Sequence, residues 1–195
     1  MTKIILATTS PSRKEAFKSL GVDFILEGSN VDESKINRDK PEELVKELSK
    51  LKAEAVAQNY KDAIVIGMDS VGYYGNKILE KPKSKEEAFQ RLTILSGNNH
   101  QFYTGVHIIN TINRETVSRV VKTEVFLRDL LEKEIEFYLD QDKFFNTYAL
   151  GYDPLGNYSS TFVKRIEGSY NNFIKGIPLE VIGEMMNILG KNLLN

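Results

Sequence analysis

The chain has 195 residues, enough for one domain with a substantial buried core. Lys and Arg number 26 against 27 Asp and Glu, which gives a formal net charge of -1. A protein that coats nucleic acid is therefore not expected, because that role needs clustered positive charge. The absence of cysteine excludes a disulfide scaffold, a thiolate zinc site and a cysteine nucleophile, and two histidines leave little for a histidine metal cluster. Any chemistry must rest on carboxylates, amines and hydroxyls.

The apolar runs of the chain are too short for a signal peptide or a membrane-spanning helix. The run near the N-terminus covers only residues 4–7. A signal peptide needs about 7–15 apolar residues in a row, and a spanning helix needs about 20. We therefore expect a cytoplasmic protein with no membrane partner.

The first third of the chain alternates predicted strands and helices. Residues 4–7 predict a buried strand, and residues 13–20 carry apolar side chains at helical spacing before a glycine. A second strand is expected at residues 23–27, followed by a long helix at residues 41–59 with one apolar stripe. Residues 63–68 are apolar on both faces, as expected for a central strand.

The middle of the chain is rich in strand-forming residues. Residues 71–79 predict a hairpin that turns near Gly75, and residues 84–95 predict a helix with a capping-box spacing at its start. Two long strands, at residues 100–112 and 116–127, are expected to pair in an antiparallel manner.

The last third predicts amphipathic helices at residues 130–139 and 179–189, with a strand at residues 161–166 between them. The whole order of elements indicates an α/β domain with a mixed sheet and flanking helices.

The loop after the first strand combines hydroxyl side chains with a basic residue. A helix N-terminus attracts phosphate because its N–H groups are unpaired and its dipole end is positive. The hydroxyls of Thr8 and Ser10 can donate to phosphate oxygens, and Arg13 can bind them with two N–H groups. The loop also fits simple helix capping by Ser10 or Ser12, with Pro11 at the first helical position. Both interpretations stay open on the residues alone.

Two acidic residues are candidates for catalysis or metal binding. Asp69 follows the apolar strand, and ligands of open α/β sheets bind beyond the carboxyl ends of strands. Asp69 can therefore hold a divalent cation or accept a proton from water, although an aspartate that begins a turn is the alternative. Glu33 lies in a polar loop, and it becomes a Mg²⁺ ligand only with a partner carboxylate such as Asp69.

Two lysines allow two interpretations each. Lys52 lies beside the apolar stripe of the long helix, where it can run along the core edge to solvent or point its ammonium into a cleft. Lys81 stands before Pro82, in a charge run that fits a solvated turn as well as a site. Neither a P-loop motif nor a G-x-G-x-x-G motif occurs, so P-loop and Rossmann classes lack support.

Eight segments stand in an order that matches the motifs of one known family. The first is Ile5-Leu6-Ala7-Thr8-Thr9-Ser10-Pro11-Ser12-Arg13, which is similar to L-A-S-x-S-P-R-R. The others are Val31-Asp32-Glu33, Lys52-Ala53, Ile66-Gly67-Met68-Asp69-Ser70-Val71, Lys81-Pro82-Lys83, Leu95-Ser96-Gly97 with His100, Thr104-Gly105, and Glu167-Gly168-Ser169-Tyr170 with Gly176-Ile177-Pro178-Leu179. From about residue 3 to residue 190, the chain resembles the Maf-like proteins, the septum-formation-inhibitor family of nucleotide pyrophosphatases.

The resemblance implies one Maf-like α/β domain over residues 1–195, with a long central mixed sheet and a cleft between two lobes. Its architecture would be related to that of inosine-triphosphate pyrophosphatases. It also implies a hydrolase that cleaves nucleoside triphosphates, often pyrimidine or modified ones, to the monophosphate and pyrophosphate with Mg²⁺ or Mn²⁺. By motif position the implied catalytic residues are Asp69 as proton acceptor, with Lys52, Lys81 and Glu33. The implied metal ligands are Glu33 and Asp69, and the implied substrate-binding residues are Thr8, Ser10, Ser12, Arg13, Ser70 and Gly156.

Three departures from the family pattern leave the base preference open. Ser12 replaces the first Arg of S-P-R-R, and Ser70 replaces the Thr after the catalytic Asp. Residues 149–156 replace A-G-x-Y-x-I-Q-G, so the specificity-linked Gln or Glu falls near Gly156. The chain thus fits neither the dTTP/UTP subgroup nor the 7-methyl-GTP/CTP subgroup cleanly.

Further alternatives stay open on the sequence. A non-catalytic nucleotide-binding regulator of cell division is the second functional hypothesis, with the departures as signs of lost activity. Glu33 and Asp69 could exchange or share the roles of base and metal ligand. The segment at residues 179–194 could pack internally or form a homodimer contact.

Overall fold

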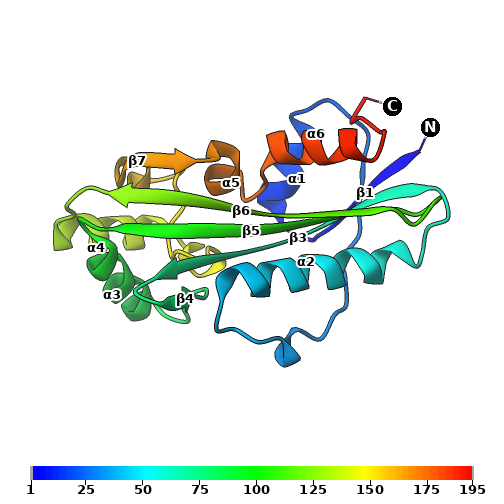
Figure 1. Cartoon of the computed structure of the whole chain (residues 1–195). Helices are drawn as coiled ribbons and strands as arrows, with labels where there is room; N and C mark the ends of the chain where they lie inside the picture. Colours follow the sequence, from blue (N-terminus) through cyan, green and yellow to red (C-terminus); the bar gives the residue numbers. More distant parts are fainter. Residues whose placement is uncertain (1, 195) are drawn as a thin grey trace. The chain divides into compact units, whose positions relative to one another are not determined.

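The computed structural model describes residues 2–194 and shows a mixed α/β fold (Figure 1). The strands are β1 (Lys3–Ala7), β2 (Ile25–Leu26), β3 (Ala63–Tyr74), β4 (Lys77–Leu79), β5 (Asn99–Asn110), β6 (Thr116–Leu127) and β7 (Val163–Gly168). The α-helices are α1 (Pro11–Lys18), α2 (Pro41–Ala57), α3 (Lys85–Leu95), α4 (Glu132–Gln141), α5 (Tyr170–Lys175) and α6 (Leu179–Ile188).

Within the described residues, seven strands form one mixed sheet. Its order is β2-β1-β3-β5-β6-β7, and β4 pairs with β3 off this path. Strand β1 runs parallel to β2 and β3, whereas the pairs β3–β4 and β6–β7 are antiparallel. The expected α/β class, with a long mixed sheet and flanking helices, is confirmed. Across residues 2–194, no helix combines the length and the apolar character that a bilayer crossing requires.

The chain divides into two compact units. Unit 1 contains the residues up to Ser70, Tyr103–Val121 and the residues from Asn171 onward. Unit 2 contains Val71–Phe102 and Lys122–Tyr170. Two units agree with the expectation of two lobes, while the cleft between the lobes stays a prediction.

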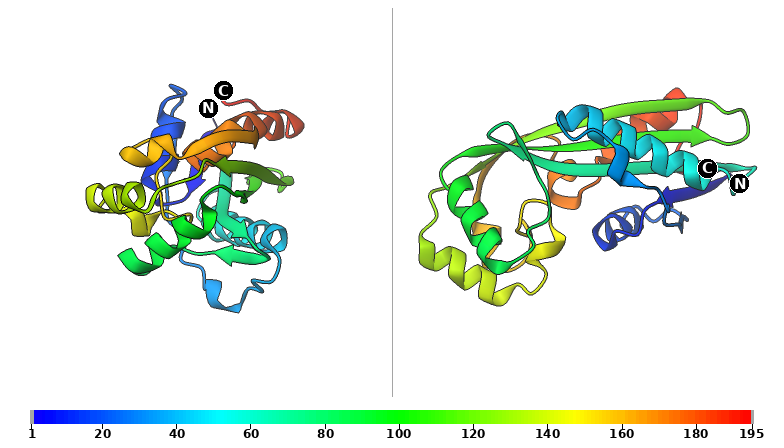
Figure 2. Two further views of the ribbon diagram at one scale, coloured as in Figure 1. Left: turned by 90° about the vertical axis from the view of Figure 1, so that its left-hand side faces the viewer. Right: turned by 90° about the horizontal axis from the view of Figure 1, so that it is seen from below.

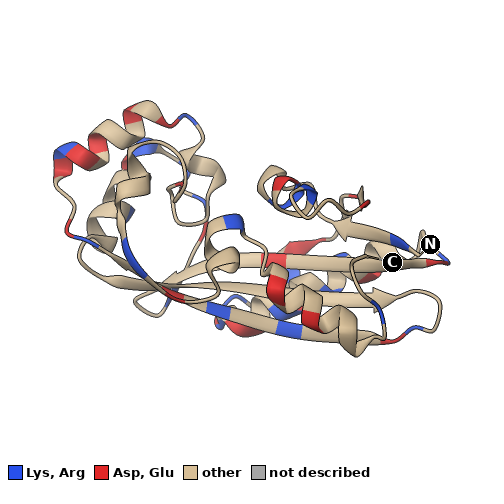
Figure 3. Ribbon diagram, turned by 90° about the horizontal axis from the view of Figure 1, so that it is seen from above, with Lys and Arg blue, Asp and Glu red and all other residues tan. Residues whose placement is uncertain are grey.

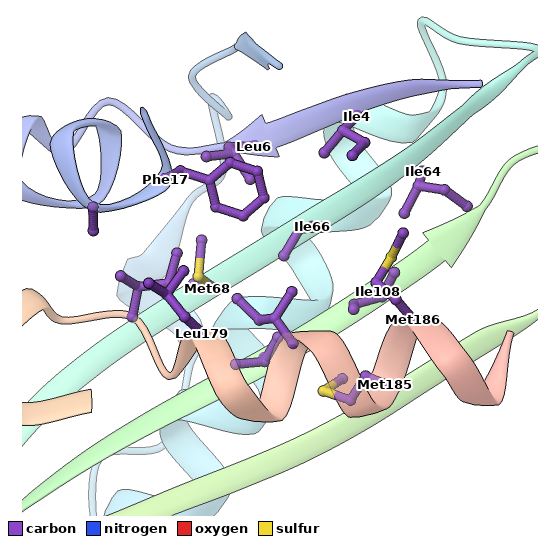
Figure 4. Close-up of a cluster of buried hydrophobic side chains, with 14 of the residues drawn as sticks. Ile4, Leu6, Phe17, Ile64, Ile66, Met68, Ile108, Leu179, Met185 and Met186 are labelled. Atoms are coloured by element: carbon purple, nitrogen blue, oxygen red, sulfur yellow. The ribbon is translucent and has the colours of Figure 1, made fainter. Parts of the chain in front are cut away.

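The sheet of unit 1 is covered on both faces. Alternate strand residues point to opposite faces, so Leu6 and Ile66 lie in one buried cluster while Ile5 and Val65 lie in another. Helices α1 and α6 cover the first face and α2 covers the second (Figure 1). Figure 4 shows the first cluster, in which side chains of α1 and α6 gather around the strands. Coverage on both faces explains why β1 and β3 contain continuous apolar runs.

Unit 2 has an aromatic core of its own. The rings of Tyr138 and Phe162 meet edge to face at 5.6 Å, and the ring of Tyr152 lies 6.2 Å from that of Phe162. Such arrangements are favoured because the positive ring edge meets the negative ring face. Helices α3 and α4 lie side by side in this unit (Figure 2).

Strand β3 differs from its prediction in a way that changes the placement of the candidate acid. The predicted strand at residues 63–68 continues to Tyr74, so Asp69 and Ser70 lie within the strand. The expectation that Asp69 lies past the strand end is therefore wrong. The parallel pairing with β1 stops at Ala7 opposite Gly67, so Asp69 follows the end of the parallel section only.

Helix α1 and strand β2 also differ from prediction. Helix α1 begins at Pro11, two residues before the predicted start, with Ser10 as its N-cap. Gly21 has a φ of 70° but follows the C-cap Ser19, and strand β2 is only two residues long. The other predicted strands and helices occur with ends shifted by at most two residues. Helix α5 and three short 3-10 helices were not predicted.

Candidate active site

Unit 1 places one lysine between two carboxylates. Lys52 Nζ lies 2.6 Å from Asp69 Oδ1 and 2.9 Å from Glu33 Oε1. The Lys52 and Asp69 side chains are 16% and 14% exposed, whereas Glu33 is 40% exposed. Partial exclusion of water strengthens such charge pairs relative to pairs at the surface. The structure thus brings together three of the four predicted catalytic residues, and Lys52 points its ammonium at the acids rather than to solvent.

A glycine lets the lysine-bearing helix approach the strand that carries the acid. A Cβ on Gly67 would lie 2.2 Å from the Ser49 carbonyl oxygen and 2.6 Å from the Ala53 nitrogen, both on α2. Lys52 directly precedes Ala53, and Asp69 lies two residues after Gly67, on the same strand face. The close backbone approach at Gly67 therefore brings α2 near enough to β3 for the Lys52 ammonium to contact the Asp69 carboxylate.

Glu33 is presented by a short 3-10 helix (Glu33–Lys35). Asp32 is its N-cap, and Asp32 Oδ1 accepts hydrogen bonds from the Ser34 backbone N–H at 3.0 Å and from Ser34 Oγ at 2.6 Å. These bonds lower the pKa of the Asp32 carboxyl from its ordinary value. The cap holds the loop backbone in place at Asp32. The next residue, Glu33, contacts Lys52 from this loop.

Arg13 reaches across unit 1 and holds three groups. Its Nε donates to the Gly176 carbonyl at 2.9 Å, its Nη1 to the Met68 carbonyl at 3.1 Å, and its Nη2 to Ser70 Oγ at 2.7 Å. Burial lowers the pKa of the Arg13 guanidinium, and the charge of Asp69 acts in the opposite direction. A guanidinium carries five N–H groups, so each Nη retains a second N–H beyond these contacts. Arg13 therefore has a structural role at the end of the parallel strands and still has donors for an anion.

The hydroxyl network behind Arg13 includes a residue that the sequence analysis missed. Ser70 Oγ and Thr104 Oγ1 lie 2.7 Å apart, and Thr104 is fully buried on β5. Thr104 belongs to the Thr104-Gly105 motif of the family, and that motif is the sequence signal that could have identified it. The motif alone does not indicate what Thr104 contacts. The Gly176 carbonyl that accepts from Arg13 was missed as well.

The loop before α1 shows capping contacts. Thr8 Oγ1 accepts from the Ser10 backbone N–H at 3.1 Å, and Ser10 Oγ accepts from the Arg13 backbone N–H at 3.5 Å. Thr8 is buried, whereas Ser12 is exposed and does not cap the helix. The substrate-binding roles of these hydroxyls stay predictions.

The two remaining candidates belong to unit 2. Lys81 is exposed and lies between β4 and α3, directly before the buried Pro82. The carbonyl of Gly156 accepts a hydrogen bond from Ser159 Oγ at 2.9 Å. A Cβ on Gly156 would lie 2.6 Å from Asp153 Oδ2, so the chain is tightly folded at this point. The relation of both residues to the charges of unit 1 stays a prediction.

The two carboxylates suit a cation site in which substrate oxygens supply the remaining ligands. Across residues 2–194, no group of three or more His, Cys, Asp or Glu side chains forms a self-sufficient metal site. Glu33 and Asp69 contact the same ammonium, so their oxygens are no farther apart than the sum of the two Lys52 distances. Mg²⁺ sites commonly use one or two carboxylates plus substrate phosphates, and this donor set suits that kind of site.

The fold and this charge cluster define a mixed α/β protein with acidic and basic side chains gathered where its parallel strands end. The chain belongs to the Maf-like protein family, whose model matches residues 3–189. The family resemblance seen in the sequence is thereby confirmed.

Relatives of the chain are similar over nearly its whole length. A dTTP/UTP pyrophosphatase of Syntrophus aciditrophicus (strain SB) is 35% identical over 193 residues, covering 96% of this chain and 90% of the relative. A dTTP/UTP pyrophosphatase of Geobacillus sp. (strain WCH70) is 40% identical over 179 residues, covering 92% of this chain and 94% of the relative. Among solved structures, that of the Staphylococcus aureus Ham1 protein matches with a TM-score of 0.46 and 21% identity, covering 65% of this chain and 72% of that chain.

Proposed function

We propose that the chain is a pyrimidine nucleoside triphosphate pyrophosphatase of the dTTP/UTP type, which releases the monophosphate and pyrophosphate. The observation that carries this proposal is the Lys52 ammonium between the carboxylates of Asp69 and Glu33. The relatives named dTTP/UTP pyrophosphatase support the substrate class. They also favour dTTP and UTP over 7-methyl-GTP and CTP, a choice that the sequence alone left open.

Asp69 is the proposed proton acceptor. Lys52 engages Asp69 Oδ1, which leaves Oδ2 to take a proton from a water molecule. The water oxygen forms a bond to the α-phosphorus while the α–β phosphoanhydride bond breaks, and the electron pair of that bond leaves with pyrophosphate. General base catalysis of this kind contributes about 10²–10⁴-fold to the rate.

The cationic side chains have a charge-neutralising role in this proposal. Positive groups that are already in place stabilise the charge that develops on a departing phosphate. Lys52 and Lys81 are assigned to that task, and Arg13 is assigned to the phosphates through its remaining N–H groups. Thr8, Ser10, Ser12, Ser70 and Gly156 are proposed as further substrate contacts.

A divalent cation, Mg²⁺ or Mn²⁺, is the proposed cofactor, with Glu33 and Asp69 as its protein ligands. When bound, such a cation neutralises phosphate charge and polarises phosphoryl oxygens. Glu33 holds its carboxylate close to Asp69 through their shared contact with Lys52. The exposed position of Glu33 leaves room for substrate oxygens beside it.

Other predictions belong to the same proposal. We assign the two units to one Maf-like domain over residues 1–195 and place the enzyme in the cytoplasm. A homodimer through residues 179–194 stays a prediction.

Pyrophosphate release from a panel of standard and modified nucleoside triphosphates tests the function. We expect turnover of dTTP and UTP by the wild type, a loss of about 10²–10⁴-fold in Asp69→Asn, and unchanged turnover in the exposed control Asp23→Asn. Chelation with EDTA should stop turnover, and added Mg²⁺ or Mn²⁺ should restore it. Near-normal turnover by a folded Asp69→Asn variant would refute the assignment. Nucleotide binding by the wild type without any turnover would favour the non-catalytic regulator instead.

A further inference from the structure

Arg91 on α3 connects two segments of unit 2 that are far apart in the sequence. Its Nη1 donates to the Glu80 carbonyl and, at 2.8 Å, to the Ala149 carbonyl. Its Nη2 donates to Glu87 Oε1 at 2.9 Å. The Arg91 side chain is only 11% exposed, whereas that of Glu87 is 42% exposed, so the guanidinium is the buried partner, and a buried donor that loses its acceptor is costly.

Glu87 extends this connection to the residues around Lys81. Its Oε2 accepts from the Lys83 backbone N–H at 2.8 Å, while its Oε1 accepts from Arg91. The pair of Arg91 and Glu87 therefore holds the backbone on both sides of Lys81, through the Glu80 carbonyl and the Lys83 N–H. None of these bonds uses the ammonium of Lys81, which is exposed.

The segment at Ala149 packs against the same place. A Cβ on Gly151 would lie 3.5 Å from Pro82 Cγ and 3.8 Å from Arg91 Cδ, so the backbone of Gly151 lies against the residue that follows Lys81. Gly151 has a φ of 81°, a conformation that glycine adopts without steric cost. The guanidinium fork is suited to this double contact, because a lysine ammonium lacks its planar set of five donors.

We propose that Arg91 is a positioning residue that holds Lys81 and the stretch at residues 149–156 in a fixed relation within unit 2. This inference rests on the proposed function, which assigns Lys81 to the phosphates and Gly156 to substrate binding. Through Arg91, the placement of a phosphate-binding charge and the placement of a substrate-contacting loop become coupled. Loss of the coupling should therefore alter the preference among nucleotides as well as the rate.

The substitution Arg91→Met tests the coupling because it keeps most of the apolar stem and removes every donor. A misplacement of about 1 Å can cost about 10²-fold in rate, so we expect kcat/KM for dTTP to fall by about that factor. The ratio of kcat/KM between dTTP and CTP should change with it. The control is Arg165→Met, the same substitution at an exposed arginine of unit 2, which should leave both quantities unchanged. The thermal unfolding curve of each variant is measured first, and all assays are run at a temperature at which every variant is folded.

A second arm separates positioning from a general loss of structure. If Arg91 acts in part through Lys81, the kcat/KM loss caused by Arg91→Met should be smaller in a Lys81→Ala background than in the wild type, because coupled residues are not additive. A loss that multiplies fully with that of Lys81→Ala, or an unchanged nucleotide ratio, would overturn the proposal.

Amide hydrogen exchange gives a readout that does not depend on turnover. Arg91→Met should speed exchange at residues 80–83 and 149–151 together, while exchange in unit 1 stays as in the wild type. Unchanged exchange in either segment would overturn the proposed connection. A wild type without pyrophosphate release would contradict the proposed function, and the exchange result would still decide whether Arg91 connects the two segments.

Discussion

At the scale of single residues, the site of unit 1 balances its own charges. The carboxylates of Glu33 and Asp69 both contact Lys52, and the charge of Asp69 also acts on the nearby Arg13 guanidinium, which contacts neither carboxylate. A nucleoside triphosphate brings several further negative charges. The proposed function therefore requires more positive charge at the site, which the proposed cation and Lys81 would supply.

A buried histidine in unit 2 gives the stability of the protein a pH dependence. His100 on β5 is fully buried, and burial lowers its pKa from 6.5 to about 4. The unfolded chain therefore binds more protons than the folded chain between these values, so the stabilising contribution is complete above pH 6.5 and is lost as the pH falls toward 4. The neighbouring Tyr152 has a raised pKa and does not titrate in this window.

We predict that lowering the pH from 7 to 5 costs about 2 kcal/mol of unfolding free energy through His100. Urea unfolding of the wild type and of His100→Gln at both pH values measures this contribution. The variant should be less sensitive to the pH change by about that amount. Equal pH sensitivity of the two proteins would contradict the burial argument.

At the scale of elements, the close approach of α2 to the sheet is the feature that builds the site. Two glycines allow it: a Cβ on Gly67 would lie 2.2 Å from the Ser49 carbonyl oxygen, and a Cβ on Gly105 would lie 2.0 Å from the Val45 carbonyl oxygen. Both obstacles are backbone atoms of a helix, which cannot move aside as a side chain can. The helix must therefore shift as a whole if either position gains a side chain.

We predict that Gly67→Ala lowers the unfolding free energy by about 1–3 kcal/mol, the usual cost of overpacking. It should also lower pyrophosphate release, because the displaced α2 carries Lys52 away from Asp69. The control is Gly183→Ala on α6, where an added Cβ meets no atom within 4 Å and helix propensity favours alanine by about 1 kcal/mol. Chemical denaturation and turnover of both variants test this pair. Wild-type stability in Gly67→Ala would show that α2 can repack without loss.

Elements with strong local signals could be predicted from the sequence. Helix α3 begins after Ser84, whose Oγ accepts from the Glu87 backbone N–H at 3.1 Å, as the capping-box spacing indicated. The link between the strand at residues 63–68 and the first strand of the hairpin at residues 71–79 had no such signal, because an aspartate at residue 69 also fits the start of a turn. Pairing with neighbouring strands keeps these residues extended, and strand formation depends on such context more than on propensity.

The charged residues of the site could be predicted only in part for a similar reason. The motif order pointed to Glu33, Lys52 and Asp69, and the structure places their charged atoms in contact. The contact of Arg13 with the Gly176 carbonyl joins positions 163 residues apart, and a backbone carbonyl has no identity that a sequence pattern could reveal. The hydroxyl contact between Ser70 and Thr104 depends in the same way on strands that meet only in the folded sheet.

At the scale of the whole molecule, the charge is balanced rather than polarised. Residues of both signs occur in each unit (Figure 3), and the formal net charge is -1. The net charge of the whole chain therefore supplies no excess of positive charge to attract an anion from a distance. Under the proposed function, recognition of a triphosphate therefore depends on local groups, and the contact between Lys52 and Asp69 is the closest charge pair among them.

A double-mutant cycle on pyrophosphate release from dTTP measures that contact most directly, using Lys52→Met, Asp69→Asn and the double variant, each checked for folding by circular dichroism. Each single variant should lose at least about 10²-fold in kcat. The double variant should be little worse than the poorer single variant, because residues that act as a unit are not additive. Losses that multiply in the double variant, or a Lys52→Met protein with near-normal turnover, would contradict the account.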